Sequence, residues 1–198
     1  MPRPTLILAS RSPARRERLS TLGIKFSCVS PDIDESPLSG ESPEDLAARL
    51  AIDKARALMT HERNALVIGS DQVCVVNGLA IGKPGTFEKA HAQLMHCAGH
   101  RISFMTGLAL LDTRDGSIQH AVEHYHAHFR QLSAQEIDQY LRKESPYECA
   151  GSFKMEGLGI TLFEKLEGDD PNTLIGLPLI RLCAMLRAAG LDPLGRDR

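Results

Sequence analysis

The sequence predicts an α/β fold, a mixed twisted sheet with flanking helices. Apolar runs of strand length alternate along the chain with amphipathic helical segments, which is typical of this fold class. An Asn77-Gly78 dipeptide between two apolar runs predicts a central hairpin, so part of the sheet must be antiparallel. The 198 residues, 42% hydrophobic and 24% charged, have the composition of a globular protein. We expect one domain over residues 1–194 and a frayed tail over 195–198.

In the first half of the chain, two helices begin with the same signature, a serine N-cap followed by proline. Ser12-Pro13 begins the first helix, which Gly23 ends, and Ser42-Pro43 begins the second. The strands expected around these helices are at 5–9, 25–30, 65–69 and 73–76. Between them, residues 31–40 form an acidic segment rich in turn residues.

In the second half of the chain, the residues that begin and end each element are again recognisable from the local sequence. In order, the expected elements are a helix capped by Thr86, strands at 101–113 and 117–129, a helix begun by the capping box of Ser133 and Glu136, an irregular glycine-rich segment at 149–160 and a helix ended by Gly190.

Charge and cysteine content exclude several function classes. The 23 Lys and Arg residues against 25 Asp and Glu argue against a sequence-independent DNA binder, which would be basic. No apolar run approaches the ~20 residues that cross a bilayer, and the N-terminus lacks the core of a signal peptide. Five widely spaced cysteines without a C-x-x-C pair indicate reduced thiols. We therefore expect a cytoplasmic protein that binds neither nucleic-acid polymers nor membranes.

The segment Ser10–Arg16 has the features of a phosphate-binding turn. An expected strand ends there, two hydroxyls precede a helix N-terminus, and Arg15 and Arg16 fall in its first turn. Free backbone N–H groups and the positive end of the helix dipole suit a phosphate, and arginine adds bidentate hydrogen bonds. The alternative is an ordinary capped helix with solvated arginines.

Carboxylates occur at two promising places. Asp32, Asp34 and Glu35 follow an expected strand, and Asp71 follows the apolar run 65–69. Side chains at strand ends in α/β sheets often face a ligand crevice. Such oxygens hold Mg²⁺ together with substrate phosphates, and one of them can take a proton from an attacking water. A solvated acidic turn is an equal alternative for the first group.

Two lysines differ in what their surroundings predict. Lys83, flanked by Gly82 and Pro84, lies in a fixed loop, where a positioned ammonium can neutralise a phosphate in the transition state. Lys54, taken alone, is typical of a surface helix position.

Three alternating histidines, His124, His126 and His128, would share one face of a strand. A metal site there is a minor hypothesis, because no fixed carboxylate or cysteine accompanies them, and an exposed strand face is more common.

Taken together, these segments resemble the Maf-like nucleotide pyrophosphatase family, in the family's order and over nearly the whole chain. The matching segments are Leu8–Arg15, Asp34-Glu35, Leu50–Ala55, Gly69–Val73, Gly82–Pro84, Ala150–Gly157 and Pro171–Pro178. The resemblance implies two lobes around a deep cleft, a fold shared with the inosine-triphosphate pyrophosphatase group. It also implies hydrolysis of a nucleoside triphosphate to monophosphate and pyrophosphate with a divalent cation, Mg²⁺ or Mn²⁺, and is compatible with a homodimer.

The resemblance also assigns roles to single positions. Asp71 resembles the family's general base, and Glu35 resembles a metal-associated carboxylate, so that these two are the expected metal ligands. The set that resembles the phosphate-binding and charge-neutralising residues is Ser10, Arg15, Lys54 and Lys83.

Three positions indicate the substrate. The branch of the family that acts on dTTP and UTP usually has Arg, Thr and Gln where this chain has Ala14, Gln72 and Glu156, and the loop around Glu156 instead resembles the subgroup assigned to 7-methyl-GTP. A guanine edge offers two N–H donors that a carboxylate accepts together, and methylation at N7 makes the base cationic. We therefore expect Glu156 to read the base, with Gln72 as a second contact and Phe153 or Phe87 as the stacking ring.

The expected role is the removal of modified nucleotides, and two alternatives stay open. Within the enzyme class, the substrate could be dTTP, UTP or another non-standard nucleotide. From another class, the family's older name of septum-formation inhibitor suggests a nucleotide-binding regulator of cell division. Asp71, Glu35 and Lys83 favour the enzyme, because a purely binding protein has no need of a positioned base.

Overall fold

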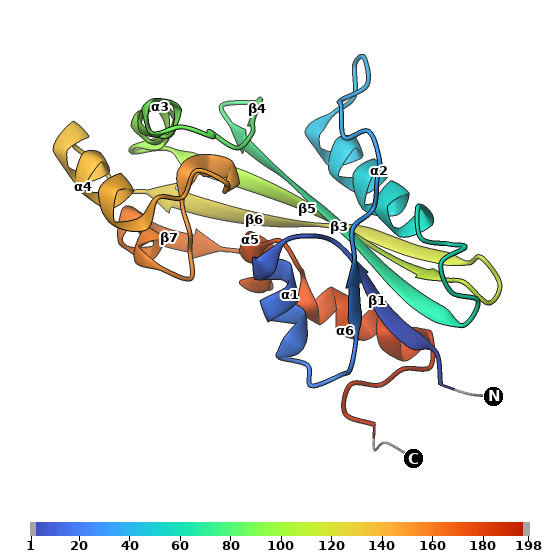
Figure 1. The fold of residues 1–198 in the computed structure, drawn as a ribbon. Helices are drawn as coiled ribbons and strands as arrows, with labels where there is room; N and C mark the ends of the chain where they lie inside the picture. Colours follow the sequence, from blue (N-terminus) through green and yellow to red (C-terminus); the bar gives the residue numbers. More distant parts are fainter. Residues whose placement is uncertain (1–2, 196–198) are drawn as a thin grey trace.

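The computed structural model describes residues 3–195 and confirms a mixed α/β fold built on a seven-stranded sheet (Figure 1). The strand order is β2-β1-β3-β5-β6-β7, with β4 paired to β3. The two pairs that β1 makes are parallel and the others are antiparallel. The strands are β1 Thr5–Ala9, β2 Ser27–Val29, β3 Ala65–Val76, β4 Leu79–Ile81, β5 Arg101–Asp112, β6 Ile118–Phe129 and β7 Phe163–Glu167. The expected tail at 195–198 lies, except for Gly195, outside the described residues.

Four of the described helices begin where their caps predict. Ser12, Ser42 and Thr86 each accept a hydrogen bond from a backbone N–H of the first turn, and Ser133 forms a complete capping box with Glu136. The helices are α1 Pro13–Ser20, α2 Pro43–Arg56, α3 Phe87–Cys97, α4 Ala134–Glu144, α5 Asn172–Ile175 and α6 Leu179–Ala188, with 3₁₀ turns η1 Ala150–Ser152 and η2 Leu158–Leu162. Within residues 3–195, none of them has the length and apolar character that crossing a bilayer requires.

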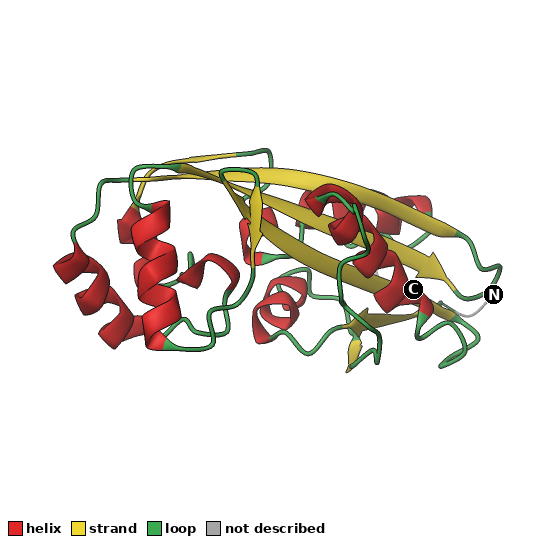
Figure 2. Ribbon diagram, turned by 90° about the horizontal axis from the view of Figure 1, so that it is seen from above, coloured by secondary structure: helices red, strands yellow, loops and turns green. Residues whose placement is uncertain are grey.

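Two lobes share the long strands β3, β5 and β6 (Figure 1). The first lobe adds β1, β2, α1, α2 and α6; the second adds β4, β7, α3 and α4 (Figures 1 and 2). In the first lobe, α2 packs on one face of the sheet and α1 and α6 pack on the other. In the second lobe, α3 and α4 cover a core that includes Phe104 and Phe129. The long strands therefore join the two lobes through one continuous sheet.

Helix α2 lies unusually close to the sheet because two glycines face it. A Cβ atom at Gly69 would lie 2.0 Å from the Ala51 carbonyl oxygen, and one at Gly107 would lie 2.0 Å from that of Ala47. Real Cβ atoms essentially never come this close, so only glycine permits the approach. This spacing brings the next turn of α2, with Lys54, against β3.

The structure differs from the sequence-based expectation at three elements. Strand β3 runs without interruption from 65 to 76, so Asp71 lies in its middle and not at a strand end. Strand β7 and helix α5 were not expected. Asp71 is nevertheless at an open place, because β1 pairs with β3 only as far as Ile68 and β4 only from Cys74. Among the described residues, no strand pairs with this edge of β3 in between.

Gly69→Ala should destabilise the protein by about 2–3 kcal/mol, because the new methyl group must push α2 off the sheet. Urea denaturation measures the free energy of unfolding. Gly82→Ala is the matched control, since its Cβ would meet nothing within 4 Å. Equal stabilities of the two variants would contradict the close-packing explanation.

Candidate active site

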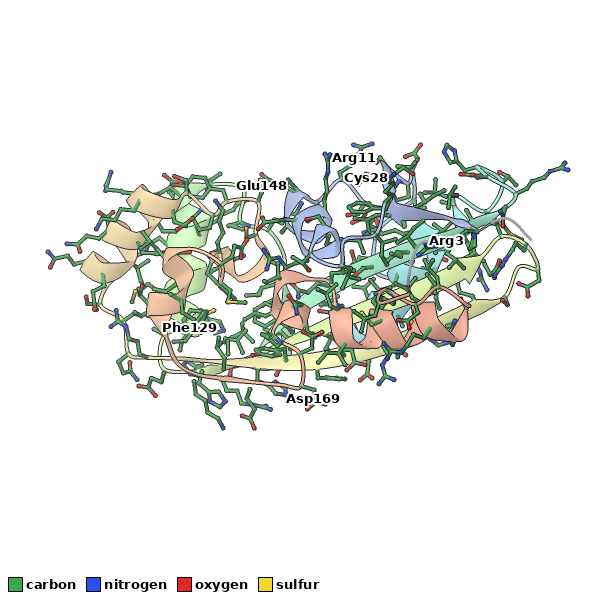
Figure 3. The ribbon with its side chains drawn as sticks, turned by 90° about the horizontal axis from the view of Figure 1, so that it is seen from below. Arg3, Arg11, Cys28, Phe129, Glu148 and Asp169 are labelled. Carbon is green, nitrogen blue, oxygen red and sulfur yellow. The ribbon has the colours of Figure 1, made fainter. Side chains whose placement is uncertain are left out.

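A cleft of about 1100 Å³ opens at the free edge of β3, between the two lobes. Its size suits a nucleotide-sized ligand. Arg11 lines it from the first lobe and Glu148 from the second (Figure 3). All the site residues predicted from the sequence line this one cleft, namely Ser10, Ala14, Arg15, Glu35, Lys54, Asp71, Gln72, Lys83 and Glu156.

Lys54 binds two carboxylates at the floor of the cleft. Its Nζ lies 2.6 Å from Asp71 Oδ1 and 2.8 Å from Glu35 Oε1. The Lys54 side chain is only 7% exposed and that of Asp71 14%, whereas Glu35 is 58% exposed. The helix pattern taken alone predicts a surface position for Lys54. This prediction is wrong, because α2 turns the side chain toward β3.

The two carboxylates fit the donor set that a divalent cation requires. Mg²⁺ is bound in proteins through one or two carboxylates, with substrate phosphates and water completing its shell. Asp71 and Glu35 contact the same ammonium and line the same cleft, so both can reach one cation bound with a phosphate. Of the other predicted carboxylates, Asp32 lines the cleft, while Asp34 accepts a hydrogen bond from the Ser36 N–H in a local turn.

Arg15 is held at the N-terminal end of α1 by a distant backbone group. Its Nε donates to the Gly176 carbonyl oxygen at 2.9 Å, and its own N–H donates to the cap Ser12. Burial lowers the pKa of Arg15, and the charges of Asp71 and Glu35 oppose this effect. Arg15 remains charged at any ordinary pH, so the cleft contains a half-buried guanidinium beside its carboxylates.

Lys83 enters the same cleft from the second lobe. It follows β4, and its Nζ lies 3.7 Å from Glu148 Oε2, a pair in which the side chains are 65% and 83% exposed. Such an exposed pair contributes little to stability. Lys83 is therefore free to exchange Glu148 for an anionic ligand.

Gln72 and Glu156 offer acceptors on the second-lobe side of the cleft. Gln72 Nε2 donates to the Thr173 carbonyl oxygen at 2.8 Å and to Thr106 Oγ1 at 3.0 Å, which fixes the orientation of the amide. Within residues 3–195, nothing donates to Gln72 Oε1 or to the exposed Glu156 carboxylate. Both oxygens are thus available to N–H donors of a ligand.

The two candidate stacking rings are placed differently. Phe87 does not line the cleft, so it is not available to a base there. Phe153 does line the cleft but is only 6% exposed, and its ring makes edge contacts with Phe104, Phe129 and Phe163. Phe153 therefore presents little of its surface to a ligand.

The three histidines lie on one face of β6, as predicted, and each has its own partner. His124 lies 3.4 Å from Glu44, His126 lies 3.0 Å from Ser103, and His128 lies 3.0 Å from Glu167. They are absent from the cleft lining.

Sequence reasoning missed the structural importance of α5. The carbonyl oxygen of Gly176 accepts hydrogen bonds from both Arg15 and Ser70, and that of Thr173 accepts from Gln72 and Thr106. Asp170, which is 4% exposed, holds the segment by accepting hydrogen bonds from the N–H groups of Asn172 and Ile180. The only advance signal was the resemblance of 171–178 to a family segment, which does not reveal these contacts.

Comparison with known proteins adds two findings. The sequence model of one protein family, described as Maf-like protein, matches residues 5–189. Among solved structures, the crystal structure of protein VC0702 from Vibrio cholerae is similar, with 12% identity and a TM-score of 0.43 over 92% of this chain and 91% of that chain. A likeness of this size carries no argument about function.

Lys54→Met should destabilise the protein by about 3 kcal/mol, because it leaves the mostly buried Asp71 carboxylate without its cation. The double variant Lys54→Met/Asp71→Asn should recover much of this loss, since the unpaired charge is then gone. Urea denaturation of both variants measures the difference. Strictly additive losses would show that the pair does not stabilise the fold through charge.

Proposed function

Because the chain belongs to the Maf-like protein family, whose members are in general nucleoside triphosphate pyrophosphatases, we propose that it hydrolyses 7-methyl-GTP to 7-methyl-GMP and pyrophosphate. The observation that carries this proposal is the placement of Lys54 between Asp71 and Glu35 in a cleft that also collects Arg15 and Lys83. These groups supply a base and positive charge for phosphoryl chemistry.

The proposed reaction breaks the bond between the α- and β-phosphates. A water molecule attacks the α-phosphorus, Asp71 takes its proton, and the electrons of the breaking bond pass to the bridging oxygen of the departing pyrophosphate. Lys54 holds the Asp71 carboxylate in place at the cleft through their 2.6 Å contact. Asp71 thus acts as the general base.

The cations of the cleft stabilise the charge that develops on the phosphate oxygens. Arg15, fixed by Gly176, and Ser10 bind from the first lobe, and Lys83 binds from the second. Asp71 and Glu35 would hold the divalent cation, Mg²⁺ or Mn²⁺, which supplies further positive charge to the phosphates.

Base selection is assigned to the second-lobe side of the cleft. Glu156 is exposed and accepts the two N–H groups of the guanine edge, and its charge favours a base made cationic by methylation. Gln72 offers Oε1 as a further acceptor, because its Nε2 is already bound to α5 and Thr106. Ala14, half-buried in the cleft wall, leaves room that a larger side chain would fill.

We also propose that residues 1–194 act as one domain, since β3, β5 and β6 run through both lobes. A cytoplasmic location is supported by the five free thiols, which suit a reducing compartment.

The function is tested by measuring pyrophosphate release with Mg²⁺ or Mn²⁺ from 7-methyl-GTP, GTP, UTP, CTP and dTTP. We expect a clear preference for 7-methyl-GTP. A preference for pyrimidine nucleotides would keep the mechanism and reject the substrate. Thermal stabilisation by a nucleotide that is not consumed would instead support a nucleotide-binding regulator.

Asp71→Asn should lower kcat by about 10²–10⁴-fold, because the amide cannot accept the proton of the attacking water. Steady-state kinetics with the preferred nucleotide measures the loss, and circular dichroism checks the fold. Asp32→Asn is the matched control, since this exposed carboxylate lines the same cleft without contacting Lys54. Wild-type turnover by Asp71→Asn would reject Asp71 as the base.

Glu156→Gln should reduce the preference for 7-methyl-GTP over UTP by about 10- to 100-fold, because a neutral amide cannot accept two N–H groups with a full charge. The ratio of kcat/KM values for the two substrates measures this. Glu164→Gln, an exposed change on β7 outside the cleft, should leave the ratio unaltered. An unaltered ratio in Glu156→Gln would reject the base-reading role.

A further inference from the structure

We infer that Gln93, on α3, is a positioning residue that ties the loop of Lys83 to the loop of Glu156. One side chain would then set both the placement of a phosphate-neutralising cation and the placement of the base-reading carboxylate. The inference rests on the proposed function, because that function is what gives Lys83 and Glu156 their roles.

The contacts of Gln93 connect two segments that lie far apart in the chain. Its Nε2 donates to the carbonyl oxygen of Gly82 at 3.1 Å, immediately before Lys83. Its Oε1 accepts from Ser152 Oγ at 2.5 Å, in the same loop as Glu156. Gly82, Lys83 and Glu156 line the cleft, whereas Gln93 does not.

Only a primary amide satisfies both partners. The Gly82 carbonyl can only accept, so the amide nitrogen must face it, and the amide oxygen must then face Ser152, whose hydroxyl donates. A carboxylate at this position would oppose the carbonyl with a second acceptor. A thioether or aliphatic side chain would leave the Ser152 hydroxyl without a partner.

Ser152 is held in a backbone conformation that needs support. It is fully buried, with a φ of +62°, and the preceding Gly151 has a φ of +78°. A residue other than glycine adopts this left-handed region only where its surroundings determine it. Its hydroxyl bond to Gln93 is the only side-chain hydrogen bond of Ser152 among the described residues. Gln93 is therefore part of what fixes this loop.

Two further contacts between the loops are of a different kind. The Gly85 N–H donates to the Tyr147 carbonyl oxygen at 3.0 Å, which keeps the loops adjacent whatever residue is at 93. The Lys83–Glu148 pair is long and exposed. Loss of the Gln93 contacts should therefore cause small shifts of the Lys83 and Glu156 loops without separating them. The variants should still fold.

Separate substitutions should separate the two effects. Gln93→Glu keeps the acceptor for Ser152 but repels Gly82, so kcat should fall about tenfold while the preference for 7-methyl-GTP over UTP is retained. Ser152→Ala releases the other loop, so the preference should fall several-fold with a smaller change in kcat. Gln93→Met removes both bonds and should show both effects. Gln139→Glu, an exposed change on the neighbouring α4, is the matched control.

A second readout does not depend on activity. Cys149 lies half-buried in the loop that Ser152 belongs to, and Cys28 lies exposed in the first lobe (Figure 3). The rate of iodoacetamide labelling at Cys149, relative to Cys28 in the same molecule, is measured by peptide mass spectrometry. We expect a several-fold rise of this ratio in Gln93→Met and none in Gln139→Glu.

The outcomes distinguish the inference from the proposed function. If Gln93→Glu and Gln93→Met match Gln139→Glu in kcat, substrate preference and labelling ratio, the inference is wrong. If both kcat and preference fall together in every variant, with no change in labelling, Gln93 has no positioning role. If the wild type releases no pyrophosphate from any nucleotide, the proposed function fails, and the labelling ratio alone decides whether Gln93 holds the loop.

Discussion

The ammonium group of Lys54 is the contact on which the rest of the site depends. It lies between Asp71 and Glu35. The Lys54 and Asp71 side chains are mostly buried, so water does little to compensate the charges of these two groups, whereas Glu35 is exposed. It reaches Asp71 only because α2 lies directly on the sheet at Gly69 and Gly107. The contact therefore requires both the two glycines and the lysine. If α2 lay further from the sheet, the Lys54 ammonium would not reach the Asp71 carboxylate.

The cleft itself follows from an interruption in strand pairing. Strand β3 is paired with β5 from Leu66 to Val75, but on its other edge β1 stops before Asp71 and β4 begins after it. The edge of β3 that pairs with β5 joins the two lobes, and the interrupted edge leaves room for a ligand. An unpaired stretch of strand is normally a liability, and here polar side chains from both lobes surround it.

Backbone carbonyl groups of the short helix α5 and of Gly176, which follows it, organise the polar side chains around this opening. They accept hydrogen bonds from Arg15 on the first-lobe side and from Gln72 on the other. Donors that are already satisfied cannot rotate freely, so these side chains enter the cleft in fixed orientations. Glu156 contrasts with them, because among residues 3–195 its carboxylate has no partner and stays available to a ligand.

The sequence by itself determined the fold class and the starts of four helices, because caps such as Ser42-Pro43 and turns such as Asn77-Gly78 act over a few residues. The motifs in the sequence also identified nine of the residues that line the cleft. It did not reveal that β3 passes unbroken through Asp71, nor that β7 and α5 exist. Those features depend on partners distant in the chain. Strand β7 pairs with β6, Thr173 in α5 accepts a hydrogen bond from Gln72, and the following Gly176 accepts one from Arg15. The burial of Lys54 was likewise decided only in the tertiary structure, because a helix pattern shows which residues share a face but not how closely a sheet approaches it.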